Sequence, residues 1–566
     1  MDTRAPTAAF LDHTPVPLAF GTSGLRGLVK DITDLEAYIN VKGALRYLLA
    51  IGDVHAGARV VLAGDLRPST ERIMRSSARA ILDSGCGVEH AGRIPTPALI
   101  LHAISTKRAG VMVSGSHIPF DRNGIKLNKS VGEVLKSDEA GIVREVARVR
   151  SEEYAKSASA SLFAPSGMLK EPGELPPLDP AAEERYVRRY MDSFAAGGLS
   201  GLRVLVYEHS AVGRDLLGRI LREFGADVVP AGRAETFIPI DTENVTGELL
   251  DRVEGLVKAA SGRIDAVVST DGDSDRPLVV AVLPAGETDA RGRRVRFLSG
   301  DLLGIVVAEY LRADAVVVPI SANDAVERRM SERGVLLRKT KIGSPYVVAG
   351  IDELCRAGTY ARIVGWEANG GFLVGSEIQL AGGGLSPLPT RDSTLPILAN
   401  LFAASEARIG LAALWSRLPA RFGAAGLIDN VPVAVSAAVM AQLVPAGDVI
   451  AVEFDGPDRV NGRGRADATS SLLSGPAGAA WRERAATVAR FFTPALGFDE
   501  IVGLNVLDGI RVSFKNGNVA HIRPSGNAPQ LRIYANSDSQ AGADRIVALG
   551  LREPDGILRQ LEKAFS

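Results

Sequence analysis

The segment from Val113 to Lys126, Val-Ser-Gly-Ser-His-Ile-Pro-Phe-Asp-Arg-Asn-Gly-Ile-Lys, contains side chains that could carry out group transfer. The apolar run Ala109–Val113 predicts a strand that delivers Ser116, His117 and Lys126 into one loop. A serine hydroxyl is a weak nucleophile unless a base or a metal helps it, and the G-x-S-x-G turn of acyl hydrolases is absent here. A serine that carries a phosphoryl group is the better interpretation. Taken alone, the histidine could equally be a packed structural residue and the lysine a surface residue.

Three carboxylates follow a second apolar strand. Asp271, Asp273 and Asp275 stand at alternate positions, where they can converge on one hard cation such as Mg²⁺, which prefers oxygen ligands. A calcium EF-hand would need a glycine and a glutamate at the places that Arg276 and Val282 occupy. The pattern therefore predicts a magnesium loop, with a solvated acidic turn as the alternative.

Two further loops could bind a polar ligand. In the glycine-rich stretch after the strand Arg362–Gly365, Glu367 and Asn369 would project to the same side of an extended backbone and could bind sugar hydroxyls. Near the C-terminus, the turn 523–529 and Arg532 could direct backbone N–H groups and guanidinium groups at a phosphate. Each pattern is weak by itself, because acidic glycine-rich turns and turns with surface arginines are common.

Strand-like and helix-like patterns alternate along the chain, as they do in α/β domains, and each loop above follows a predicted strand. Open α/β sheets bind ligands at the carboxyl ends of their strands, which is where these loops lie. The clearest predicted elements are strands at Arg203–Tyr207, Ala315–Ile320 and Gly509–Phe514 and helices at Gly213–Phe224 and Asp301–Leu311. We predict three tandem α/β domains and a C-terminal α+β domain with a strand pair bent at Asn516-Gly517, at residues 1–165, 180–297, 298–420 and 428–566. The Ser-, Ala- and Pro-rich stretch Ser151–Pro180 is typical of a linker.

The composition narrows the class of protein. At 566 residues the chain is too long for one core, and a 46% hydrophobic and 23% charged composition is typical of a folded enzyme. The net charge of −1 argues against a protein that binds nucleic acid or an anionic membrane. Cys86 and Cys355 are too few for a disulfide framework or a thiolate metal site. Without a long apolar run or a secretory signal pattern at the N-terminus, we expect a cytoplasmic protein.

Together and in this order, the loops resemble those of the α-D-phosphohexomutase superfamily, over nearly the whole chain. Ser116 falls on the phosphoserine of T-A-S-H-N-P, and Lys126 falls on the lysine of the following N-G-x-K. Asp271–Arg276 is similar to the magnesium loop D-G-D-x-D-R. The other similar segments are Phe20–Gly27 (F-G-T-x-G-x-R-G), Asp65–Ser69 (D-x-R-x-S), Arg523–Asn527 (R-P-S-G-T), Thr340–Gly343 and Arg391-Asp392. Glu367 and Asn369 fall on the sugar loop G-E-x-S.

The resemblance implies an active site in a central cleft and a phosphoryl transfer between O6 and O1 of a hexose, through phospho-Ser116 and a hexose 1,6-bisphosphate that also serves as activator. The implied catalytic residues are Ser116, Arg26, Lys126 and His117, with Lys126 needing a depressed pKa to act as a base. The implied ligands of Mg²⁺ are Ser116, Asp271, Asp273 and Asp275. The implied substrate-binding residues are Arg276, Glu367, Asn369, Arg523, Ser525, Gly526, Asn527 and Arg532.

The resemblance further implies a small-molecule phosphosugar as the partner, no nucleic acid or membrane, and a monomer or homodimer. Mannose phosphate is the preferred substrate because the loops with Asn369 and Asn527 look like those of phosphomannomutases. Glucose phosphate or dual specificity is the close alternative. Gly371 stands where many members have a histidine, so a general base from that loop is in doubt. A metal-dependent sugar phosphatase with Asp271 or Asp273 as nucleophile, and a catalytically silent paralogue, are the rivals from other classes.

Overall fold

The computed structural model describes residues 10–21, 24–289, 291–445, 447–456, 459–464, 470–525 and 529–565. Contacts divide the chain into two compact units, Met1–Val317 with Gly343–Arg417, and Val318–Ile342 with Leu418–Ser566. Both contain helices and strands, which confirms the predicted mixed α/β class. The four predicted domain boundaries are finer than this division and stay predictions.

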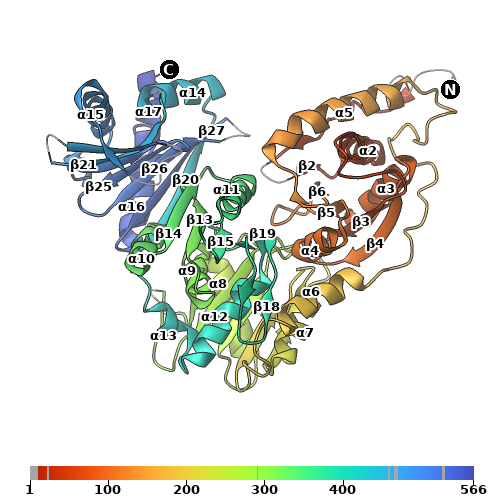
Figure 1. Ribbon diagram of the computed structural model, residues 1–566, viewed down its shortest axis with the longest axis horizontal. Helices are drawn as coiled ribbons and strands as arrows, with labels where there is room; N and C mark the ends of the chain where they lie inside the picture. Colours follow the sequence, from red (N-terminus) through yellow and green to blue (C-terminus); the bar gives the residue numbers. More distant parts are fainter. Residues whose placement is uncertain are drawn as a thin grey trace. The chain divides into compact units, whose positions relative to one another are not determined.

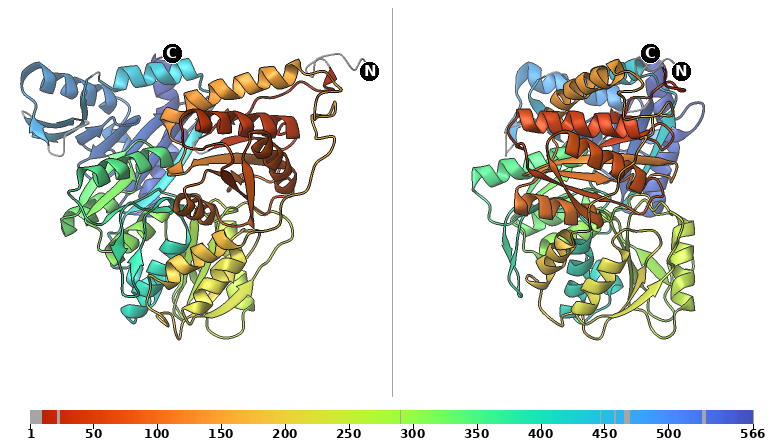
Figure 2. Two further views of the ribbon diagram at one scale, coloured as in Figure 1. Left: turned by 45° about the vertical axis from the view of Figure 1, so that its right-hand side comes forward. Right: turned by 90° about the vertical axis from the view of Figure 1, so that its right-hand side faces the viewer.

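The first sheet of the larger unit carries the loop that contains Ser116 and His117, here called the serine loop. Its strands are β1 (Ala19–Phe20), β2 (Leu25–Leu28), β3 (Arg59–Gly64), β4 (Gly87–Arg93), β5 (Gly110–Val113), β6 (Arg122–Lys129) and β7 (Gly132–Glu133). They lie in the order β1-β2-β6-β5-β3-β4, with β7 beside β6. The helices α2 (Asp34–Ala50), α3 (Thr70–Asp83) and α5 (Lys136–Ala155) cover one face and α4 (Thr96–Thr106) the other (Figure 1). Helix α2 packs against both α3 and α5 (Figure 2).

Lys126 lies on a strand and not in the serine loop, so the prediction that one loop holds Ser116, His117 and Lys126 was wrong for the lysine. After the loop the chain turns back as β6, which pairs antiparallel with β5 and sets Lys126 opposite Met112. Ile125 and Leu127 enter the core on one face of this sheet. Side chains alternate along a strand, so Lys126 lies on the opposite face, at the carboxyl end of the neighbouring strand β5.

The second sheet carries residues 271–276, here called the acidic loop, which contains Asp271, Asp273 and Asp275. Its strands are β8 (Arg203–Tyr207), β9 (Asp227–Ala231), β10 (Ala266–Thr270), β11 (Pro277–Val282) and β12 (Val295–Phe297), in the order β12-β11-β10-β8-β9. Its helices are α6 (Ala181–Met191), α7 (Arg214–Glu223) and α8 (Gly247–Ala259). Strand β11 runs antiparallel to β10 from Thr270↔Pro277 onward. Residues 271–276 are therefore the turn of a hairpin whose two strands are buried.

A third group of elements carries residues 367–371, the predicted sugar loop, which contains Glu367 and Asn369. It comprises β13 (Ala315–Pro319), β15 (Ile363–Trp366), β16 (Phe372–Val374), β17 (Ile378–Gln379), β18 (Gly384–Leu385), β19 (Leu388–Asp392), α9 (Gly300–Tyr310), α11 (Ser344–Ala357), α12 (Thr394–Glu406) and α13 (Leu411–Trp415). Strand β16 pairs antiparallel with β15, with Trp366 opposite Phe372. The stretch between them is a tight turn, so the expected extended backbone at Glu367 and Asn369 was wrong. Two antiparallel strands this close leave room only for a turn.

The smaller unit contains an eight-stranded antiparallel sheet in the order β20-β27-β26-β25-β24-β21-β22-β23. The strands are β20 (Phe422–Asp429), β21 (Val449–Asp455), β22 (Arg459–Gly464), β23 (Ser471–Leu472), β24 (Ile501–Asn505), β25 (Ile510–Phe514), β26 (Val519–Pro524) and β27 (Gln530–Ser537). The other elements are α10 (Ala325–Arg333), β14 (Leu336–Thr340), α14 (Val433–Leu443), α15 (Gly475–Ala489), the 3-10 turn Pro494–Leu496, α16 (Gln540–Leu551) and α17 (Ile557–Phe565). Val512, Ile522 and Ile533 face the core.

Most predicted elements form within one or two residues of their expected limits. Strands β8, β13 and β25, helices α7 and α9, and the turn at Asn516-Gly517 are examples. The linker prediction was wrong at its start, because α5 continues to Ala155. The rest of that stretch is irregular apart from a bridge between Phe163 and Leu169. Among the residues that the structure describes, no helix has the length and apolar character needed to cross a membrane.

Candidate active site

Ser116 is held in a strained and buried position at the end of β5. It is 1% exposed, and its φ of 55° lies in the left-handed region, which non-glycine residues rarely adopt. Its Oγ donates a hydrogen bond to Oδ2 of Asp271 at 2.6 Å, and Nδ1 of His117 lies 3.4 Å away. Strain of this kind persists where the surroundings fix a functional side chain. The loop therefore presents one hydroxyl to the acidic loop.

Arg67 clamps the serine loop from behind, a role that the sequence interpretation missed. Its guanidinium donates to four backbone carbonyls, three in the serine loop and one at the start of β6, those of Ser116, Ile118, Pro119 and Arg122. Its side chain is fully buried, and its Nε lies 3.2 Å from Oδ2 of Asp65. A Cβ at Gly115 would stand 2.7 Å from the guanidinium carbon, so only glycine leaves room for the clamp there. The D-x-R-x-S similarity at Asp65–Ser69 was the signal that could have identified it.

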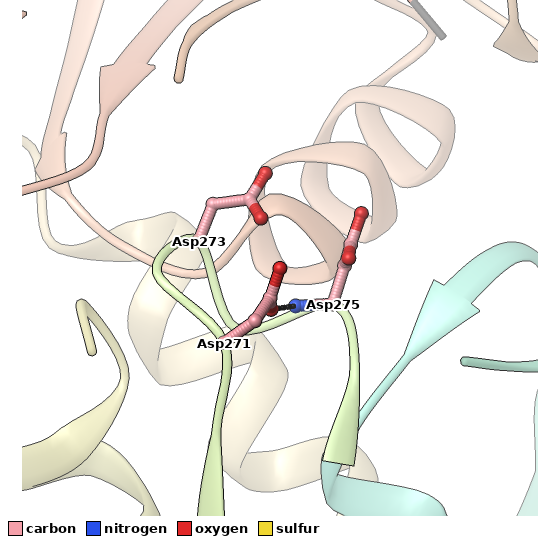
Figure 3. Close-up of side chains that lie close together, drawn as sticks. All are labelled: Asp271, Asp273 and Asp275. Carbon is pink, nitrogen blue, oxygen red and sulfur yellow. Dashed lines mark hydrogen bonds between the residues drawn. The ribbon is translucent and has the colours of Figure 1, made fainter. Parts of the chain in front are cut away.

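The three aspartates converge at the hairpin turn (Figure 3). Asp271, Asp273 and Asp275 are fully buried, and one oxygen from each lies within 4.8 Å of the others. Within the described ranges, this is the only group of three or more such side chains with metal-binding geometry. The backbone N–H of Asp275 donates to Oδ1 of Asp271 at 3.1 Å, which fixes the turn. Oδ1 of Asp273 and Oδ1 of Asp275 are buried without a hydrogen-bond partner among the described residues.

The negative charges of these three carboxylates repel one another. Burial and the charges of Asp273 and Asp275 raise the pKa of Asp271 well above its usual value. Burial also disfavours ionisation of Asp275, but Arg391, Lys126 and Arg276 outweigh it and lower the pKa of that carboxyl. Buried carboxylates with unused oxygens are a fitting ligand set for a divalent cation, which would relieve their repulsion. The geometry therefore supports a metal site.

Lys126 forms part of the same charge cluster. Its Nζ forms an ion pair with Asp275 at 2.9 Å and a second, shorter one with Asp273. Burial would lower the pKa of Lys126, but the two aspartates raise it above its usual value. The depressed pKa that a lysine base would need is not found. Lys126 is suited instead to carry positive charge beside Ser116.

Further basic side chains lie close to the acidic loop and to His117. Burial, followed by the charges of Arg276 and Arg391, lowers the pKa of Arg26 to about 10. Burial and the charges of Arg276 and Arg26 lower the pKa of His117 to about 2, so the imidazole is neutral at physiological pH. Arg276 is buried, and its Nε has no hydrogen-bond partner among the described residues. This concentration of positive charge is suited to a phosphoryl group.

Arg391, at the end of β19, joins the acidic loop to the sugar loop and was absent from the predicted site residues. Its guanidinium contacts Oδ2 of Asp275 through Nη2 at 2.9 Å and Oε2 of Glu367 through Nη1 at 3.0 Å. Oδ1 of Asn369 accepts from the backbone N–H of Gly371 at 3.0 Å and shapes the turn. The Nδ2 group of the same amide could then donate to a ligand. The similarity of Arg391-Asp392 to family elements was the signal for this residue.

The predicted phosphate loop lies in the smaller unit. Arg523 on β26 and Arg532 on β27 are directly opposite partners, so both side chains lie on one face of the sheet. Nε of Arg523 is 3.6 Å from Oδ1 of Asp508. The backbone N–H of Ser525 donates to the carbonyl of Gln530 at 2.9 Å. The predicted residues Gly526 and Asn527 lie outside the described residues.

Comparison with protein families gives three matches along the chain. Residues 17–153 match phosphoglucomutase/phosphomannomutase, alpha/beta/alpha domain I, and residues 299–422 match alpha/beta/alpha domain III of the same family. Residues 479–549 match its C-terminal domain. Ser116 lies in the first matched segment, Glu367 and Arg391 lie in the second, and Arg523 lies in the third.

Similar proteins and structures agree with these matches. A phosphomannomutase of Sinorhizobium fredii is 35% identical over 532 residues, which cover 94% of this chain and 98% of the relative. A phosphomannomutase of Salmonella muenchen is 34% identical over 530 residues, covering 93% and 94%. The solved structure of a phosphoglucomutase/phosphomannomutase family protein from Burkholderia thailandensis shares the fold, with a TM-score of 0.61 and 17% identity, covering 96% and 97%. The chain belongs to the α-D-phosphohexomutase superfamily.

Proposed function

We propose that this protein is a phosphomannomutase, which interconverts mannose 6-phosphate and mannose 1-phosphate through phospho-Ser116 and a hexose 1,6-bisphosphate. The observation that carries the proposal is the hydrogen bond from Ser116 Oγ to Asp271, because it places a strained serine at a three-carboxylate site. The two phosphomannomutase relatives, matched over nearly their whole lengths, favour mannose as the sugar. Phosphoglucomutase or dual activity is the close alternative.

Mg²⁺ is the proposed metal. Asp271, Asp273 and Asp275 supply only oxygen ligands, and two of their buried oxygens have no hydrogen-bond partner among the described residues. A phosphoryl oxygen on Ser116 would be a further oxygen ligand, and Mg²⁺ usually keeps several waters as well. When bound, Mg²⁺ would neutralise negative charge on the transferring phosphoryl group.

Phosphoryl transfer would start when a free hydroxyl of the sugar attacks the phosphorus on Ser116. The new bond joins the sugar oxygen to phosphorus, the bond from phosphorus to Oγ breaks, and the sugar hydroxyl loses its proton. Lys126, Arg26 and Arg276 would stabilise the charge that develops on the equatorial oxygens. The freed Oγ takes up the proton that the sugar hydroxyl gives up, and neutral His117, whose Nδ1 lies 3.4 Å from Oγ, would accept a hydrogen bond from that serine hydroxyl. The reverse step with the other phosphate completes the reaction.

Binding of the distal phosphate would hold the sugar while its other end reacts. Arg523, Ser525, Gly526, Asn527 and Arg532 are the proposed phosphate-binding residues. Glu367 and Asn369 are the proposed ligands of the sugar hydroxyls, and both must serve the two orientations of the bisphosphate. Remote contacts of this kind orient the reacting end. The sugar 1,6-bisphosphate as activator, a cytoplasmic location and a monomer or homodimer complete the proposal.

The proposal is tested by a ³¹P NMR time course with Mg²⁺ and a trace of hexose 1,6-bisphosphate. Mannose 1-phosphate and glucose 1-phosphate are offered separately. A 6-phosphate product without inorganic phosphate supports the mutase, and the faster substrate identifies the sugar. Inorganic phosphate as the main product would favour a sugar phosphatase with Asp271 or Asp273 as nucleophile. No change with either sugar would favour a silent paralogue.

A further inference from the structure

The two carboxylate oxygens of each aspartate in the acidic loop have different surroundings. Oδ1 of Asp271 accepts from the backbone N–H of Asp275 at 3.1 Å, and its Oδ2 accepts from the hydroxyl of Ser116. Oδ2 of Asp275 accepts from Nζ of Lys126 and from Nη2 of Arg391, each at 2.9 Å. Oδ1 of Asp275 is buried and has no hydrogen-bond partner among the described residues. In both side chains the protein fixes one oxygen and leaves the other for the serine or a metal.

Asp273 follows the same pattern, with Thr96 as one of its donors. Oδ2 of Asp273 accepts from Oγ1 of Thr96 at 2.7 Å and from Nζ of Lys126. Its Oδ1 is buried without a hydrogen-bond partner in the part of the chain that the structure describes. Lys126 also pairs with Asp275 and has a flexible stem, so it does not fix the rotation of the Asp273 carboxylate alone. The hydroxyl of Thr96 supplies a second donor to the same oxygen.

Thr96 is the first residue of α4, a helix that packs on the first sheet. It is 2% exposed, and its backbone N–H donates to the carbonyl of Asp273 at 3.0 Å. The first N–H groups of a helix have no partner inside the helix, and α4 uses one of them to bind the acidic loop. Pro97 fixes the backbone in the same turn. The backbone and the side chain of one residue thus hold the same aspartate at two points.

Docking of α4 against the acidic loop does not explain the hydroxyl of Thr96. The backbone hydrogen bond to Asp273 already joins the two segments, and it does not depend on the side chain. The hydroxyl instead contacts the carboxylate, on the oxygen next to the unpaired one. Carboxylates that bind metals are usually oriented by hydrogen bonds of this kind, and losing one typically weakens metal binding about tenfold to a hundredfold.

We propose that Thr96 is a positioning residue of the metal site, whose hydroxyl holds Oδ2 of Asp273 so that Oδ1 stays available to the cation. The inference rests on the proposed function, because it needs the Mg²⁺ site on Asp271, Asp273 and Asp275. It extends that site to a helix of the first sheet. The ligands of the cation come from the second sheet, and the orientation of one of them would depend on the first.

The test compares Thr96→Val, which keeps the shape and loses the donor, with Thr96→Ser, which keeps the hydroxyl. Thr106→Val is the matched control, because Thr106 lies at the other end of α4 and its hydroxyl donates to the carbonyl of His102 at 2.7 Å. Calorimetric titration of each metal-free protein with Mg²⁺, at matched phosphorylation of Ser116, gives the dissociation constant. We expect it to rise about tenfold to a hundredfold in Thr96→Val and to stay at the wild-type value in Thr96→Ser and Thr106→Val.

Melting temperatures separate metal positioning from a general loss of stability. In EDTA, Thr96→Val and Thr96→Ala should both melt below the wild type, because each lacks a buried hydrogen bond. The gain in melting temperature on adding a fixed concentration of Mg²⁺ should also be smaller in both variants. A purely structural role predicts the first effect without the second. An unchanged dissociation constant in Thr96→Val and Thr96→Ala, or equal weakening in Thr96→Ser, would overturn the inference.

Kinetics connect the metal to turnover and distinguish the two levels of proposal. At saturating Mg²⁺ the kcat of Thr96→Val should approach that of the wild type, while half-maximal activity should need more Mg²⁺ by the factor found in the titration. A wild type that binds Mg²⁺ but forms neither phospho-Ser116 nor a sugar 6-phosphate would refute the mutase, and the titrations would still decide the role of Thr96. A wild type that binds no Mg²⁺ would overturn the metal assignment and this inference together.

Discussion

The hydroxyl oxygen of Ser116 lies 2.6 Å from Oδ2 of Asp271, although the two residues are 155 positions apart in the sequence. One comes from the loop after β5 and the other from the hairpin turn after β10, each at the carboxyl end of a buried strand. A phosphoryl group on this serine would be next to three carboxylates and Lys126. The contact links the proposed nucleophile to the candidate metal site.

Removing the hydroxyl of Ser116 should abolish the mutase. In Ser116→Ala no phosphoenzyme can form, and we expect kcat to fall at least about a thousandfold, the scale seen when a covalent nucleophile is lost. The fold should survive, since alanine fits the same space. Kinetics and phosphopeptide mass spectrometry after incubation with hexose 1,6-bisphosphate measure both effects. Ser151→Ala, an exposed site on α5, is the control, and turnover in Ser116→Ala near the wild-type rate would refute the role.

Metal removal should stop the reaction and destabilise the larger unit. Asp271, Asp273 and Asp275 repel one another when ionised, so a bound cation should raise the melting temperature in proportion to its binding. EDTA-treated protein should regain activity and melting temperature with Mg²⁺. Asp273→Asn should need at least about tenfold more Mg²⁺ for half-maximal activity, the scale of a lost carboxylate contact. Full activity after exhaustive chelation would contradict the metal assignment.

Replacing Arg391 should damage both the fold and the activity. Its guanidinium bridges Asp275 and Glu367, and the side chain is 4% exposed. Arg391→Met would leave two buried carboxylates without this partner, a change that costs about 3–5 kcal/mol in buried pairs. Arg391→Lys keeps the charge but cannot span both partners, so stability should fall less while kcat still falls about a hundredfold, the cost of a small misplacement. Urea unfolding and steady-state kinetics measure the two effects.

The control for this pair is Arg252→Met, at an exposed position of α8. It should change neither the unfolding midpoint nor kcat. If Arg391→Lys behaved like this control, the link between the acidic loop and the sugar loop would have no part in catalysis.

The sequence was most informative where a local pattern decides the structure. Apolar runs such as Arg203–Tyr207 and Ala315–Ile320 became β8 and β13, because buried strands of α/β sheets need apolar side chains on both faces. Because these strands could be located, Ser116 and Asp271 could each be placed just after the carboxyl end of a buried strand. Their mutual contact could only be expected from the resemblance, since no local pattern specifies which two sheet edges face each other.

What escaped prediction depends on contacts between distant segments. Arg67 is an arginine in a short turn, and nothing local shows that it reaches carbonyls up to 55 positions away. Lys126 was assigned to a loop because the antiparallel return of β6 onto β5 has no signal in one strand alone. Likewise, the bridge from Arg391 to Asp275 spans 116 positions. Such contacts follow from tertiary packing.

A buried histidine in the smaller unit should make stability depend on pH. His521 is 1% exposed, its Nε2 donates to the backbone carbonyl of Asp508 at 2.7 Å, and Arg511, Arg523 and Lys339 lie nearby. Burial, together with these cations, lowers its pKa to about 3 despite that hydrogen bond. The folded pKa is therefore below the unfolded value of about 6.5.

The sign of the effect follows from proton binding. Below about pH 6.5 the unfolded chain takes up a proton on His521 that the folded protein refuses, so stability is full above that pH and falls as the pH drops. From pH 8 to pH 5 the loss at this site is about 2 kcal/mol, at 1.36 kcal/mol for each unit below 6.5. His521→Gln keeps a donor for the carbonyl of Asp508 but does not titrate, so its pH-dependent loss should be smaller by that amount. Urea unfolding at both pH values, with hydrogen exchange of the β26 amides to report on this sheet, measures the difference. An equal loss in wild type and His521→Gln would show that another group controls the acid sensitivity.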